Sequence, residues 1–120
     1  MATVNDAILK ILTTPDKITE VLARGNEYYF RFGGHAFSVL SRTEDTENLG
    51  EHSFYVYPDW PDSLESLSAA FERQNDIKLV VYNANELPPQ TQRVLRQLAK
   101  LLEEKSLNVH KVFDDVVKEE

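Results

Sequence analysis

Hydrophobic and polar residues alternate along two neighbouring stretches of the chain, one on each side of Gly33-Gly34. Both stretches are rich in aromatic and β-branched residues, which favour strands. A glycine pair between such stretches is typical of a two-residue hairpin turn, because glycine adopts the required positive φ angles without steric cost. The sequence therefore predicts a β-hairpin over residues 27–42. The predicted cross-strand pairs are Phe32–His35, Phe30–Phe37 and Tyr28–Val39.

Upstream of the hairpin, apolar residues recur every three or four positions, which is typical of helices. A first helix is expected to begin after Thr3, with Asp6 placed to complete a capping box. A second helix is expected between Pro15 and Gly25, because proline is favoured at the first helical position and glycine often follows a helix end. Residues 1–25 are thus predicted to form a helical pair.

Downstream of the hairpin, the pattern predicts a third strand over residues 53–57 and a helix that starts near Asp62. Residues 77–82 form a continuous apolar run, which predicts a strand covered on both faces. Residues 88–118 are predicted to form two helices. The second of these is expected to turn its apolar side chains inward: Val109, Val112, Phe113, Val116 and Val117.

These elements predict one α+β domain over residues 1–120. Its segments are a helical pair (1–25), a three-stranded meander (27–57), a helix and a strand (62–83) and two C-terminal helices (88–118). A strand–helix–strand unit usually makes a right-handed parallel crossover. The expected sheet is therefore mixed and four-stranded, an antiparallel meander plus one strand after a helical crossover. With helices packed against this sheet, the fold class is a two-layer α+β domain.

The net charge of -7 is concentrated in the middle of the chain, where residues 43–76 hold nine acidic side chains against Arg73. Such a segment repels nucleic acids and membrane surfaces and attracts basic partners. The chain has no cysteine, which excludes disulfides and thiolate chemistry. No basic region precedes an apolar run at the N-terminus, so we expect neither a secretory signal nor a membrane span, and a cytoplasmic location.

Two groups of side chains are candidates for partner binding. Four acidic residues fall in the polar stretch after the hairpin, although a role in solubility is the simpler explanation for them. Aromatic residues near an arginine are typical of interface hot spots, and several are expected on the exposed sheet face; the alternative is that amphipathic tyrosines cover a small sheet. The predicted contact residues are Glu44, Asp45, Glu47, Glu51, Tyr29, Arg31, Tyr55, Tyr57 and Trp60.

Catalytic and metal-binding patterns are missing from the sequence. His35, His52 and His110 have no spacing of three or four residues, so no local metal site is predicted. The sequence contains no nucleophile elbow, phosphate-binding loop or dinucleotide fingerprint. We therefore predict no catalytic residue, no metal and no cofactor.

The first functional hypothesis is a small, acidic, soluble protein-interaction module without catalytic activity, such as an adaptor, an inhibitor or a neutralising partner. The expected partner is a basic protein. An alternative is a small hydrolase or transferase with a site that the sequence does not reveal, and a second alternative is a nucleic-acid-associated regulator, which the charge disfavours. A homodimer is also compatible with the sequence, because a basic stripe on the 88–106 region complements the acidic segment. The stripe consists of Arg93, Arg96 and Lys100.

Overall fold

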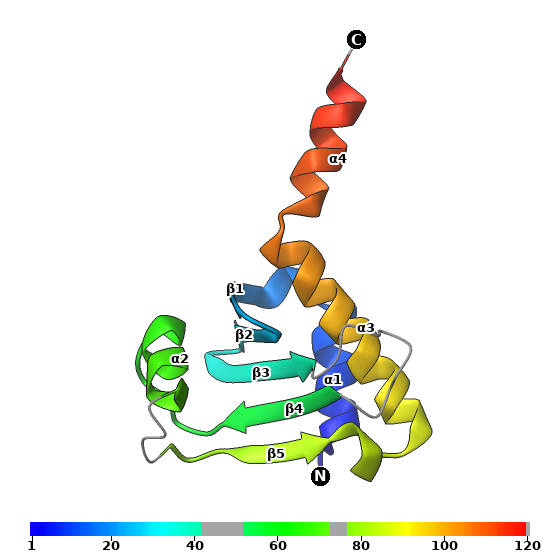
Figure 1. The fold of residues 1–120 in the computed structure, drawn as a ribbon. Coiled ribbons are helices and arrows are strands. Elements are labelled where there is room, and N and C mark those ends of the chain that lie inside the picture. Colours follow the sequence, from blue (N-terminus) through cyan, green and yellow to red (C-terminus); the bar gives the residue numbers. More distant parts are fainter. Residues whose placement is uncertain (42–51, 73–76, 120) are drawn as a thin grey trace.

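The chain folds around one antiparallel sheet whose five strands follow in chain order, β1-β2-β3-β4-β5 (Figure 1). This computed structural model describes residues 1–41, 52–72 and 77–119. The strands are β1 (Ile18–Arg24), β2 (Glu27–Phe32), β3 (His35–Ser41), β4 (His52–Tyr57) and β5 (Val80–Asn83). The predicted α+β class is confirmed.

Helices pack on both faces of the sheet, which corrects the two-layer prediction. One face carries α1 (Val4–Thr13) and α3 (Pro89–Ser106), which form a core with β2, β3 and β4 around Phe30. The opposite face carries α2 (Leu64–Glu72), which packs on the tyrosines of the sheet. Short 3-10 turns, η1 (Pro15–Lys17) and η3 (Ala84–Glu86), connect elements, and α4 (Val109–Lys118) ends the chain. In the described part of the chain, no helix combines the length and apolar character needed to cross a membrane.

The predicted hairpin is confirmed in its turn and in its register. Gly33 and Gly34 have φ angles of 60° and 79°, the left-handed values that favour glycine. Phe30 pairs with Phe37 across the two strands, and their ring centroids are 5.4 Å apart. Phe37 in turn stacks on Phe54 of β4 at 5.6 Å. The aromatic row therefore ties the meander together on the face that α1 and α3 cover.

The predicted second helix is wrong, because the segment after η1 forms strand β1. Gly25, with a φ of 59°, belongs to a tight hairpin turn in which Arg24 pairs with Glu27, so it does not follow a helix end. Pairing with the whole of β2 supplies inter-strand hydrogen bonds and packing, and such contacts readily outweigh a weak local helix preference. The sheet thus gains a fifth strand.

The predicted parallel crossover is also wrong, because β5 runs antiparallel to β4, with Val56 opposite Val80 and Ser53 opposite Asn83. Helix α2 lies at one end of the sheet, and β5 runs beside β4 in the opposite direction (Figure 1). β5 is an edge strand, and Val80 is 46% exposed. Tyr82 packs against the core on the α1 and α3 face, and Val81 packs against the cluster on the α2 face, so the expected cover on both faces is found except at Val80.

Candidate functional site

Helix α4 projects away from the rest of the molecule (Figure 1). α3 ends at Ser106, and the backbone N–H groups of Leu107 and Asn108 bond back to the carbonyls of Glu103 and Lys105, both at 3.1 Å. Asn108 then adopts a left-handed conformation with a φ of 54°, which asparagine tolerates better than most residues. This turn separates α4 from α3, and α4 extends the molecule to 53 Å along its longest axis.

The apolar side of α4 is exposed, which corrects the prediction that it turns inward. The exposed fractions are 54% for Val112, 59% for Phe113, 66% for Val116 and 83% for Val117. Residues at these spacings lie on one side of a helix. Leu107, at the junction with α3, is 65% exposed as well. The helix itself was predicted correctly, but its apolar face lies in contact with solvent.

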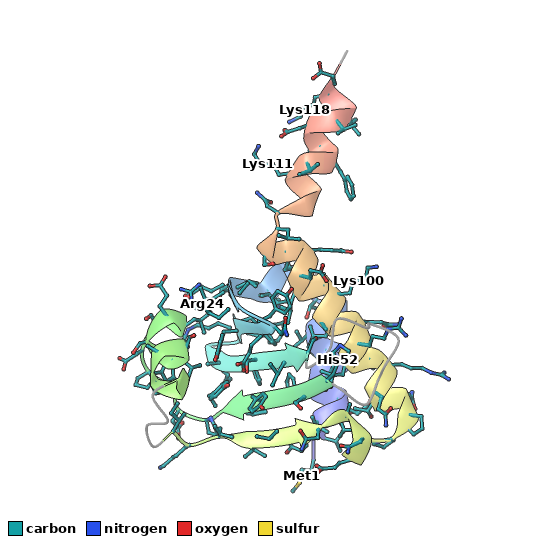
Figure 2. All side chains as sticks on the ribbon, viewed as in Figure 1. Met1, Arg24, His52, Lys100, Lys111 and Lys118 are labelled. Carbon is teal, nitrogen blue, oxygen red and sulfur yellow. The ribbon has the colours of Figure 1, made fainter. Side chains whose placement is uncertain are left out.

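The other side of α4 is polar and nearly balanced in charge. Lys111 forms an ion pair with Asp115 at 3.0 Å, one turn along the helix. Asp114 and Lys118 are exposed on the same helix. Figure 2 shows Lys111 and Lys118 on the projecting helix, apart from the side chains of the sheet. α4 therefore combines an apolar face with a polar face that carries no strong excess of either charge.

A second polar feature lies within the sheet, on the side that α2 covers. The Glu27 side chain is only 7% exposed, and its carboxylate accepts hydrogen bonds from Tyr29 Oη at 3.0 Å and Ser38 Oγ at 2.7 Å. Tyr57 Oη lies 2.8 Å from Ser38 Oγ. Because the Ser38 proton points to the carboxylate, Tyr57 must donate to Ser38. The cluster is thus a chain of hydroxyl donors that ends on one buried carboxylate.

The environment of Tyr57 favours its neutral form. Burial raises the pKa of this phenol above its ordinary value of 10.0, and the nearby Glu27 carboxylate raises the pKa further. The hydrogen bond with Ser38 lowers the pKa; this effect is smaller than that of burial but larger than that of Glu27. Ser38 is completely buried, so its hydroxyl cannot reach a substrate, and the cluster is best suited to stabilising the sheet.

The tyrosines predicted as exposed contacts are buried. Tyr29 and Tyr57 belong to the hydroxyl–carboxylate cluster, and Tyr55 stacks on Tyr57 with ring centroids 6.3 Å apart. Leu64 and Leu67 of α2 complete the apolar cluster around them. The expectation of an exposed aromatic face is wrong, because α2 covers it, and the alternative of tyrosines that cover a small sheet describes the packing better.

Arg31 and Trp60 remain at the border of this face. Arg31 donates to the carbonyl oxygens of Asp62 and Gly34, and Trp60 Nε1 donates to the carbonyl of Ser63 at 3.1 Å. These bonds hold the segment before α2 and the end of the hairpin in place. Their role in partner binding stays a prediction. The other predicted contact residues, Glu44, Asp45, Glu47 and Glu51, lie outside the described residues.

Sequence reasoning found the α4 residues but not their role. The periodicity shows that a helix has an apolar face, but it does not show which surface covers that face. Within the described ranges, no group of three or more histidine, aspartate or glutamate side chains is arranged to hold a metal ion. Comparison with known proteins gives no match to a family model, a curated protein or a solved structure. The function must therefore be argued from the geometry of the chain.

Proposed function

We propose that this protein is a non-catalytic protein-interaction module that presents the apolar face of α4 to another polypeptide. The observation that carries the proposal is the exposure of four large apolar side chains on one face of one helix. Single exposed apolar residues are common, whereas a continuous apolar patch usually marks an interaction site. Covering these side chains would remove their apolar surface from water, which is the main driving force of association.

The length of α4 supports the same conclusion. α4 has ten residues, and isolated helices shorter than about 12–15 residues are marginal in water. Most helical stability in proteins comes from packing of an apolar face, and here that face is exposed. A partner that packs on Val112 and Val116 would supply the missing stabilisation.

The other classes of function have less support. A hydrolase or transferase needs an accessible nucleophile or base, and the described carboxylate–hydroxyl cluster is buried. A nucleic-acid-associated regulator needs a basic surface, whereas the chain has a net charge of -7. An anionic membrane surface attracts helices rich in lysine and arginine, whereas Lys111 and Lys118 on α4 are matched by Asp114 and Asp115. The acidic contacts to a basic partner and the cytoplasmic location stay predictions.

A capture experiment with a matched control tests the proposal. Val116→Asp places a charge on the apolar face, and Lys118→Asp places the same side chain elsewhere on α4. Tagged wild type and both variants are incubated with a soluble extract that also contains untagged copies of the chain. We expect the wild type and Lys118→Asp to retain the same polypeptides. Val116→Asp should no longer retain them. An identical retained set for all three proteins would overturn the proposal.

A further inference from the structure

We propose that the polypeptide that covers α4 is a second copy of this chain, with the two α4 helices packed antiparallel about a two-fold axis. The inference rests on the proposed function, because it names the partner of the same face. Homodimers with two-fold symmetry are the most common oligomers, and their interfaces bring the same patch of both copies together. The apolar face of α4 is suited to such self-complementary packing.

Among the described residues, the body of the protein offers no other apolar surface of similar size. Outside α4 and the adjoining Leu107, the exposed large apolar side chains are Met1, Leu9 and Val80. They lie at the N-terminus, on α1 and on the edge strand β5. Within the described chain, the surface that best matches one α4 is therefore another α4.

The charge of the protein and the dipoles of its helices favour one direction of pairing. Each copy carries a net charge of -7, so close approach of two bodies is opposed by repulsion. α4 projects from its body (Figure 1), and an antiparallel pair places the two bodies at opposite ends of the helix pair. A parallel pair would place them side by side. Antiparallel packing also sets the two helix dipoles in opposite directions, which is favourable.

The size of the apolar face limits the strength of the dimer. At about 25 cal/mol per Å², the usual gain of about 1.5–3 kcal/mol for burying such a side chain corresponds to about 60–120 Å² of apolar surface. Scaled by their exposed fractions, the four side chains of α4 together offer roughly 200–300 Å² of apolar surface in each copy. With a polar rim of ordinary proportion, the whole interface would bury about 1,000 Å² or less, at the low end for specific complexes. The dimer should therefore be weak and dependent on concentration, and the monomer should remain folded.

Sedimentation velocity over a series of protein concentrations tests the association. We expect a reversible monomer–dimer equilibrium for the wild type and for Lys118→Asp. Val116→Asp should weaken dimerisation at least about tenfold, because it removes one buried apolar side chain from each copy and adds a charge. A wild type that stays monomeric throughout would overturn the inference. If the wild type stayed monomeric but Val116→Asp abolished its capture of a different polypeptide, the proposed function would stand without the dimer. If no captured polypeptide depended on α4 either, the proposed function and the dimer inference would both fail.

The absence of native cysteine allows the direction of pairing to be tested with single-cysteine variants. Phe113 lies near the middle of α4, so Phe113→Cys should form a disulfide-linked dimer on mild oxidation. Val117→Cys should not, because antiparallel packing centred on residue 113 separates the two copies of residue 117 by about 12 Å along the axis. Equal cross-linking of the two variants would indicate parallel packing, and no cross-linking of Phe113→Cys would also overturn the proposed arrangement.

Discussion

At the scale of single residues, the most unusual side chain is Glu27. A carboxylate that is nearly buried costs free energy unless strong hydrogen bonds replace its hydration. Here two hydroxyl groups donate to it, and the donor chain runs from Tyr57 through Ser38. The sheet thus contains a satisfied polar cluster on the face that α2 covers, and its removal should affect stability.

Replacing the carboxylate tests this role. Glu27→Gln keeps the size of the side chain but offers one carbonyl oxygen and an amino group in place of two acceptor oxygens. We expect the free energy of unfolding to fall by about 1–3 kcal/mol, measured by urea denaturation. Glu20→Gln, at an exposed position of β1, is the matched control and should change it by less than about 0.5 kcal/mol. Equal effects of the two changes would show that the buried cluster contributes little.

The raised pKa of Tyr57 predicts a loss of stability at alkaline pH. Above pH 10 the unfolded chain loses the phenol proton while the folded protein keeps it, so the unfolded state is favoured as pH rises. The free energy of unfolding should fall by up to about 1.4 kcal/mol per pH unit because of the Tyr57 phenol. The slope of unfolding free energy against pH should be smaller for Tyr57→Phe and retained in Ser38→Ala, which keeps the phenol. Wild type and Tyr57→Phe with the same slope would contradict the assignment.

At the scale of elements, local signals predicted α1 and the central hairpin correctly. The capping box at Thr3 and Asp6 forms as expected, and Gly33-Gly34 fixes the register. The segment that became β1 was misinterpreted, because Ile18, Val21 and Leu22 also fit helical spacing. The informative signal was Gly25-Asn26 directly before an alternating run, which is typical of a hairpin turn as well as of a helix end.

The turn at Gly33-Gly34 gives a test that isolates backbone strain. A Cβ atom at Gly34 would meet nothing within 4 Å, so a substitution there is penalised by its φ of 79° alone. We expect Gly34→Val to cost about 1–3 kcal/mol of unfolding free energy in urea denaturation. Gly33→Asn is the control, because asparagine accepts the left-handed conformation and is favoured in such turns. A Gly34→Val protein as stable as Gly33→Asn would argue against positive φ at this position.

At the scale of the whole molecule, the sequence could not predict the direction of β5 or the surroundings of α4. Both depend on contacts between distant parts of the chain. The apolar run before Tyr82 is compatible with a parallel or an antiparallel neighbour, and in the structure β5 pairs antiparallel with β4. Likewise, the apolar positions of α4 identify a face, but whether that face is covered depends on the turn at Asn108.

That turn divides the molecule into a packed body and a projecting helix, and α4 is proposed to find its partner outside its own chain. Hydrogen exchange of the α4 amides in the purified protein tests the claim most directly, at one protein concentration that favours dimers and one that favours monomers. We predict slow exchange at the high concentration, and fast exchange on dilution and in Val116→Asp, because a lone ten-residue helix is marginal in water. Exchange at the same rate under all three conditions, whether fast or slow, would contradict the account.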